Sequence, residues 1–368
     1  MEVNFLPHFK LELLLVKICG VWDYLYKTKY EYVYWLYFVV VNIYLSIYNL
    51  MKFDDMLHAT TLEEIVAAGF VLPIALMGNI RSFCFFAYRK EFFELLTTMD
   101  DEVFQPTDQV QVAMAKKMLK VYSVFKVVMY WGSIVPSFGC VIGRILTGKP
   151  QEHCESVINS SKGIEMYIFQ AIALGMISVV NVVTNYFMAG FALFVGLQCD
   201  QLCYQLINME LVENVSIKKF VLHHRRILRF AGNLEKLFSI IYFTFIIMCL
   251  LAFCMTLFMI SVTDKFSYQI FHLVFYQFSI FVMLLIPCWF STQLTIKSEK
   301  IPFAAYSSPW TGASKSFKNE LMIFLLNSQE PIQLKAMDIV DLSLETYMAI
   351  VKSSFSYYTV LNNLIFGE

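Results

Sequence analysis

Long apolar stretches recur along the whole chain and constrain its fold more than any other feature. One of them, residues 240–260, reads IIYFTFIIMCLLAFCMTLFMI and contains no charged residue. A helix crosses a bilayer when about 20 consecutive residues are predominantly apolar. The chain is 58% hydrophobic and 15% charged, whereas soluble domains are about 45–50% apolar and about 25% charged. The sequence therefore predicts an all-α protein that crosses a membrane several times.

We predict seven membrane-spanning helices from these stretches. They cover residues 33–51, 65–87, 119–146, 164–209, 237–262, 268–296 and 340–365. The fourth is too long for one crossing, so it is expected to continue as a helix beyond the membrane. Residues 11–19, LELLLVKIC, are too short to span, carry Glu12 and Lys17, and show no small-residue cleavage site. We expect a half-buried amphipathic segment there rather than a signal peptide.

Basic residues set the expected orientation of the spans. They gather before the first span and after the second, fourth and sixth, whereas the alternate loops hold few of them. Because cytoplasmic loops carry an excess of Lys and Arg, the N-terminus is predicted to be cytoplasmic and the C-terminus extracellular. Asn159-Ser-Ser is then a glycosylation acceptor on an outside loop. Cys140 and Cys154 flank that loop, and whether they form a disulfide stays open, because spacing alone does not fix the geometry.

Several classes of function are disfavoured by what the sequence lacks. It contains no HExxH, no nucleophile elbow and no phosphate-binding loop, so we predict no enzyme activity, no cofactor and no metal site. A net charge of -1 argues against a nucleic-acid partner. No internal repeat is evident, which disfavours an inverted-repeat transporter. The predicted orientation is the reverse of that of a G-protein-coupled receptor.

Aromatic side chains interleaved with small polar ones fill the outer halves of several predicted spans. A cavity walled by rings, with a few hydroxyl and amide groups, suits a small, apolar, volatile-sized molecule. The alternative is that these rings simply pack the bundle, and His272 is as much a packing residue as a ligand contact. The candidate wall residues are Phe70, Ile74, Ser133, Phe138, Phe169, Ala173, Ile177, Phe275 and Tyr276.

The last span carries a polar stripe at helical spacing. Its members are Glu345, Ala349, Lys352, Ser356, Val360, Asn363 and Gly367. A charged side chain at the bilayer centre costs roughly 2.5–3.5 kcal/mol on insertion scales, so such residues normally face protein or water. The stripe fits a water-filled pore with a hydrophobic constriction at Val360 and Leu364. The alternative is a polar seam inside a single-chain bundle. One helix cannot enclose a pore, so the first interpretation requires an oligomer.

Residues 316–327, SFKNELMIFLLN, precede this last span. They open with Ser316, a residue type that caps helices, and place apolar side chains on one face. Twelve residues are too few to span a bilayer. We therefore expect a short amphipathic helix on the cytoplasmic side of the membrane.

The final third of the chain resembles the insect odorant receptor family. The resemblance rests on SPW at 308–310, SQEPIQLKA at 328–336 and DLSLETYMAIVKSSFSYYTVL at 341–361. The gustatory receptors share the architecture, but their usual tail signature, T-Y followed by two hydrophobic residues and Q-F, is not found here, which makes them the more distant relatives. A G-protein-coupled receptor of inverted topology and a secondary transporter remain the rival classes.

The resemblance implies a tetrameric, odorant-gated, non-selective cation channel in the plasma membrane of olfactory dendrites. In such a channel residues 1–313 form the ligand-binding bundle, 314–339 a cytoplasmic anchor and linker, and 340–368 the pore helix. The gate then falls on Val360 and Leu364 with Asn363 between them, and Glu345, Lys352 and Ser356 line the pore. The loop between the fourth and fifth spans is short, which favours an odour-tuned subunit over the family's coreceptor. The implied partners are a volatile odorant, coreceptor subunits, permeant monovalent and divalent cations, and membrane lipid.

Overall fold

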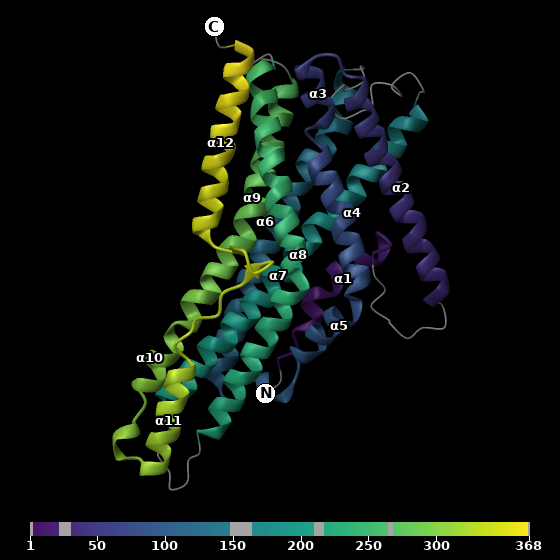
Figure 1. Cartoon of the computed structure of the whole chain (residues 1–368). Coiled ribbons are helices and arrows are strands. Elements are labelled where there is room, and N and C mark those ends of the chain that lie inside the picture. The colour runs from purple at the N-terminus through teal and green to yellow at the C-terminus, as the bar shows by residue number, and fades with distance from the viewer. Residues whose placement is uncertain (1–2, 22–30, 148–163, 210–216, 264–267, 367–368) are drawn as a thin grey trace.

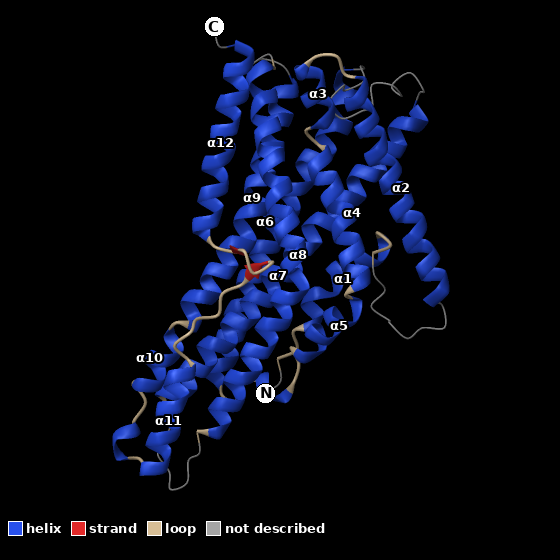
Figure 2. Cartoon of the chain, in the orientation of Figure 1, coloured by secondary structure: helices blue, strands red, loops and turns tan. Residues whose placement is uncertain are grey.

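The computed structural model describes residues 3–21, 31–147, 164–209, 217–263 and 268–366. Within these ranges helices dominate, and the strands form one two-stranded hairpin (Figure 2). The α-helices are α1 (Lys10–Ile18), α2 (Glu31–His58), α3 (Leu62–Gly69), α4 (Leu72–Ala87), α5 (Arg89–Thr98), α6 (Gln109–Thr147), α7 (Ile164–Ile207), α8 (Lys218–Val262), α9 (Tyr268–Ser298), α10 (Lys300–Tyr306), α11 (Lys315–Asn327) and α12 (Leu344–Phe366). Short 3₁₀ helices cover Leu6–Phe9, Glu102–Phe104 and Trp310–Gly312, and the strands are β1 (Lys335–Ala336) and β2 (Val340–Asp341).

The long helices form a bundle around α7, with α12 reaching the upper end of the molecule and α10 and α11 at the lower end (Figure 1). In the described part of the chain, five stretches are long and apolar enough to cross a bilayer: 32–58, 62–87, 165–207, 218–262 and 269–306. The two other predicted spans correspond to α6 and α12, whose 39 and 23 residues suffice in length. The chain is therefore an all-α membrane protein with the predicted set of seven spans.

The second predicted span is not one continuous helix. It begins at Leu62, where Thr61 and Glu64 form a reciprocal capping box, and it breaks after Gly69. A new helix, α4, begins at Leu72 with Pro73 in its first turn. Proline lacks the N–H that a continuous helix would need there, and it is favoured in a first helical turn. The break matters because it places Val71 and Ile74 beside α7.

Two helices begin well before the apolar stretches that predicted them. The predictions placed the third and fifth spans at 119 and 237, whereas α6 begins at Gln109 and α8 at Lys218. Together with α7, α10 and α11, the extra turns of α8 build the lower end of the molecule (Figure 1). The early turns of α8 bury Phe220, His224 and Ile227 on one face while their charged residues stay in solvent. A search for apolar stretches misses such amphipathic turns.

The helix α11 and the segment after it also differ in detail from the expectation. The N-cap of α11 is Ser314, whose hydroxyl accepts from the N–H of Phe317, so the prediction of Ser316 as the opening residue is wrong by one half-turn. Residues 340–341 are strand rather than helix, and they pair antiparallel with 335–336. Met337 and Asp338 turn this hairpin with positive φ angles of 55° and 56°. Gly, Asn and Asp dominate such turns, so Asp338 fits the usual pattern and Met337 departs from it.

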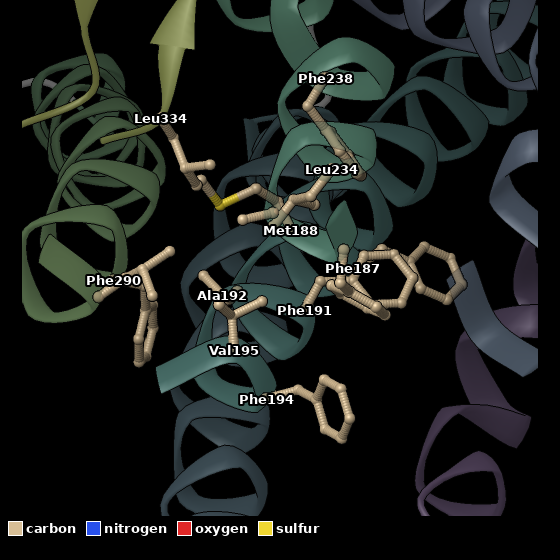
Figure 3. Packing of buried hydrophobic residues seen from close by; sticks show 14 of the residues in the cluster. Phe187, Met188, Phe191, Ala192, Phe194, Val195, Leu234, Phe238, Phe290 and Leu334 are labelled. Carbon is tan, nitrogen blue, oxygen red and sulfur yellow. The ribbon is translucent and has the colours of Figure 1, made fainter. Parts of the chain in front are cut away.

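The centre of the bundle is a cluster of aromatic rings on one side of α7. Phe187, Phe191 and Phe194 point toward one side, whereas Ala192 and Val195 face Phe290 on another (Figure 3). The rings of Phe187 and Phe92 meet edge to face with centroids 4.6 Å apart, a favoured aromatic geometry. Because α7 is apolar around its whole circumference, it can be buried on all sides.

The N-terminal helix α1 lies against this cluster as a half-buried element. Leu13 and Val16 are buried, whereas Leu11 and Leu14 are exposed. Glu12 is fully buried, and one of its carboxylate oxygens lies 2.6 Å from the Lys126 ammonium group of α6. The amphipathic segment that the sequence predicted is therefore held to α6 by an ion pair between a buried carboxylate and a half-buried ammonium group.

Candidate ligand cavity and pore helix

A cavity of about 60 Å³ lies between α4, α7 and α9. Its walls are mainly aliphatic and aromatic, with one imidazole, one amide and three hydroxyl groups among them. The lining residues are Val71, Ile74, Ala75, Leu174, Ile177, Ser178, Asn181, Val182, His272, Tyr276, Ser279, Ile280 and Met283. An apolar space with a few convergent polar groups is typical of a site for a small organic molecule.

Helical periodicity explains why these residues meet. On α9, His272, Tyr276, Ser279 and Met283 recur every three or four positions and therefore share one face. On α4, the break before Leu72 lets the first turn approach α7 at the level of Ile177. The cavity thus depends on the interruption in the second span.

Three of the predicted wall residues, Ile74, Ile177 and Tyr276, line the cavity. Phe70 lies behind Tyr276: the two rings are edge-on with centroids 5.4 Å apart, and the Tyr276 hydroxyl donates to the Phe70 carbonyl at 3.4 Å. Phe70 therefore supports a wall residue and does not itself face the space.

The other predicted wall residues lie elsewhere. Phe169 and Ala173 face α2, where the ring of Phe169 packs against Tyr44 at 4.5 Å. Phe275 is 51% exposed on the outer side of α9 and does not line the cavity. The side chains of Ser133 and Phe138 lie outside the described residues.

The sequence prediction missed most of the lining residues on α7. Leu174 and Asn181 stand three residues before and four after Ile177, so they share its face, whereas Ser178 stands next to Ile177 and four residues after Leu174. Extending the helical face from Ile177 would have found Leu174 and Asn181. His272, which the sequence left open between packing and ligand contact, lies in the cavity wall.

A buried guanidinium group lies next to the cavity. Arg81 of α4 has no exposed surface, and its Nη1 donates to the backbone carbonyl of Asn181 at 2.5 Å. Its Nη2 donates to the Asn185 Oδ1 at 3.3 Å, and its guanidinium carbon lies 4.4 Å from the ring centroid of Phe245. These contacts are those expected of a charge that must be solvated inside a membrane protein.

Asn185 extends this polar network to two further helices. Its Nδ2 donates to the Met283 carbonyl of α9 at 3.2 Å, and its Oδ1 also accepts from the Tyr242 hydroxyl of α8 at 3.3 Å. Asn181 and Met283 both line the cavity. The network therefore ties the cavity walls on α7 and α9 to α4 and α8.

The helix α12 packs on α8 and α9 and leaves its polar stripe uncovered by the rest of the chain. Ile350 and Ser354 are buried against the bundle. The stripe lies on the opposite side of the helix, and its described side chains are exposed: Glu345, Lys352, Ser356, Val360 and Asn363. The Leu364 side chain lies outside the described residues. A stripe that faces away from its own bundle is available to water or to another subunit.

Three other predicted features fall outside the described residues: the acceptor Asn159, the side chain of Cys140, and Cys154. Among the residues that the structure does describe, no group of three or more His, Cys, Asp and Glu side chains is arranged to hold a metal ion.

Comparison with known proteins matches most of the chain to one family. The family described as 7tm Odorant receptor matches residues 61–355. Odorant receptor 10 of Aedes albopictus is 26% identical over 151 residues, 41% of this chain and 40% of that protein. Odorant receptor 13a of Drosophila melanogaster is 28% identical over 227 residues, 55% of this chain and 53% of that protein. The matched regions span about half or less of the length of these curated relatives.

The fold also matches a solved structure over nearly its whole length. The insect olfactory receptor OR5 of Machilis hrabei, in complex with eugenol, superposes with a TM-score of 0.86, covering 97% of this chain and 98% of that one at 13% identity. A second solved structure of the same receptor gives the same TM-score at 14% identity. From its sequence match over residues 61–355, the chain belongs to the 7tm odorant receptor family, a family of receptors rather than enzymes.

Proposed function

We propose that this chain is an odour-tuned subunit of an odorant-gated, non-selective cation channel. The observation that carries the proposal is the position of the polar stripe of α12, which faces away from the bundle that holds the cavity. Symmetry around an axis beside α12 would bring several such stripes together and enclose a water-filled pore. The eugenol complex of the similarly folded OR5 is consistent with a small volatile ligand for this fold.

The proposed gating mechanism follows the packing of the helices. A volatile molecule occupies the cavity between α4, α7 and α9, and α12 rests on α8 and α9. Ligand shifts the closed–open equilibrium by as much as its affinities for the two states differ. In the open state the pore helices move apart at Val360 and Leu364, and Asn363 faces the widened passage.

The remaining parts of the proposal concern assembly and orientation. The channel is a heterotetramer with coreceptor subunits in the dendritic plasma membrane of an olfactory neuron, with the N-terminus cytoplasmic and the C-terminus extracellular. Residues 314–339 belong to the cytoplasmic anchor between subunits, and Asn159 carries a glycan outside. Monovalent and divalent cations pass the pore.

Filling the cavity is expected to weaken odorant responses. Ala75 lines the cavity and is fully buried, so Ala75→Leu inserts the larger side chain where the ligand would lie. Overpacking by this much typically costs about 1–3 kcal/mol, and about 1.4 kcal/mol corresponds to tenfold in affinity. We expect the half-maximal odorant concentration to rise about tenfold in whole-cell recordings with the coreceptor, using a panel of alcohols, phenols, esters and ketones.

The matched control is Ala173→Leu, because Ala173 is equally buried but packs toward α2 outside the cavity. This variant should keep its potency once currents are normalised to surface protein. Unchanged potency in Ala75→Leu would contradict the assignment of this cavity as the ligand site.

A further inference from the structure

The amide of Asn181 is held in one orientation in the cavity wall. Asn181 is 1% exposed, and its Nδ2 donates to the backbone carbonyl of Ile74 at 3.0 Å. A carbonyl oxygen can only accept, so the amide nitrogen must be the atom that faces Ile74. The two ends of the amide are therefore distinguishable, and Oδ1 is the end that remains for another partner.

That oxygen accepts no hydrogen bond from any residue in the described part of the chain, although it is buried. Arg81 directs Nη1 to the backbone carbonyl of Asn181 and Nη2 to Asn185, while its buried Nε donates to no residue in the described part of the chain. Buried polar atoms nearly always have a hydrogen-bond partner. For a buried acceptor in the wall of a cavity that lacks a protein partner, we expect a molecule bound in the cavity to supply the donor. The group that satisfies it must bring a hydrogen-bond donor.

The surroundings restrict what kind of donor fits. The cavity walls are mainly apolar, so the rest of the ligand must be apolar as well. An ammonium group would place a second positive charge near the buried guanidinium of Arg81 and would lose its hydration. Ethers, esters and ketones offer acceptors alone and would leave Oδ1 buried without a partner. A neutral hydroxyl group meets both conditions.

We propose that the cavity is selective for small, mainly apolar alcohols and phenols, whose hydroxyl group donates to the Oδ1 of Asn181. The proposal rests on the proposed function, because it names the chemical class of the ligand that gates the channel. A site built to bond a hydroxyl rejects an analogue that lacks it, since the protein acceptor is then left buried without a partner. Asn181 is thus a specificity-determining residue.

The test compares isomeric pairs that differ in the hydroxyl group. The pairs are 1-octanol with heptyl methyl ether, and 2-phenylethanol with benzyl methyl ether. Each ether has the atoms of its alcohol but no O–H donor. Currents are recorded from cells that express the full chain with the coreceptor, and the half-maximal concentrations within one pair are divided to give a potency ratio. This ratio does not depend on the amount of protein at the surface. In the wild-type channel we expect the alcohol to be about tenfold more potent than its isomer.

Two variants separate the acceptor oxygen from the bond to Ile74. Asn181→Leu and Asn181→Asp both lose the donation to the Ile74 carbonyl, but Asn181→Asp keeps an acceptor oxygen at this place. The ratio should fall to about one in Asn181→Leu and persist in Asn181→Asp. If either variant fails to reach the membrane, stabilisation of the purified wild-type protein against heating is measured with both members of each pair.

The possible outcomes distinguish this inference from the proposed function. Three results would overturn the proposed selectivity and still leave an odorant-gated channel in place. They are equal potency of alcohol and ether in the wild-type channel, equal stabilisation of the purified protein by both, and a tenfold preference that persists in Asn181→Leu. Silence toward all four probes, with no stabilisation by any of them, contradicts both.

Discussion

Replacing Val360 with serine is expected to raise the current that flows without odorant about tenfold. Val360 lies on the polar stripe of α12 and is 55% exposed in the single chain. In the proposed channel it forms part of an apolar constriction that stays closed because it does not wet. Removing one valine side chain from a constriction that excludes water changes the free-energy difference between the closed and open states by at least about 1.5 kcal/mol. This corresponds to roughly tenfold in the closed–open equilibrium. Whole-cell recording before odorant application measures the change.

The matched control at this position is Val360→Ile, which keeps the constriction apolar. It should leave the resting current at the wild-type level. An unchanged resting current in Val360→Ser, with normal surface expression, would remove Val360 from the gate. The stripe of α12 would then be better explained as a polar contact between subunits.

Replacing Asn185 with leucine is expected to destabilise the fold by about 3 kcal/mol. Asn185 accepts from the Arg81 guanidinium and from the Tyr242 hydroxyl, and both donors stay buried when the amide is removed. Hydrogen bonds to a charged group are worth about 1.5–3 kcal/mol, and an abandoned buried donor adds its desolvation cost. The free energy of unfolding is measured by SDS titration of the purified protein.

The double variant Arg81→Met/Asn185→Leu tests this reasoning. Removing the charge together with its acceptor leaves an apolar contact, so much of the lost stability should return. Asn208→Leu is the matched control, because Asn208 is exposed just after α7 and its amide donates to the Tyr204 carbonyl in the last turn of that helix. Losses that simply add in the double variant would show that Arg81 and Asn185 do not act as a unit.

Hydropathy predicted the number of spans because the apolar stretches are required by the lipid bilayer and not by tertiary contacts. Hydropathy did not predict the first turns of α8, because they precede the apolar stretch. The helix nevertheless begins at Lys218, where Phe220 and Ile227 are buried against the rest of the chain. The hairpin at 335–341 was missed for a different reason. Its turn places Met337 at positive φ, where Gly, Asn or Asp is usual, so Asp338 is the one turn residue that fits the pattern.

The candidate site was less predictable because side-chain direction depends on neighbours. Ile177 and Tyr276 were found from aromatic and apolar clustering, but the same criterion selected Phe275, which lies on the outer side of α9. Arg81 was missed although a charge within a span is itself a sign of a buried polar site. Its partners, Asn181 and Asn185, stand about 100 positions further along the chain and are apparent only once α4 and α7 are packed.

In the proposed channel, ligand binding opens a pore formed by the receptor itself. Outside-out patches, excised from cells that express this chain with the coreceptor, test it most directly when the pipette holds neither GTP nor ATP. We predict that a volatile alcohol applied to the outer face evokes cation-selective single-channel openings within the lifetime of the patch, and that Ala75→Leu reduces them at the same concentration. Openings that require GTP in the pipette, or that vanish on excision although the intact cell responds, would contradict the claim.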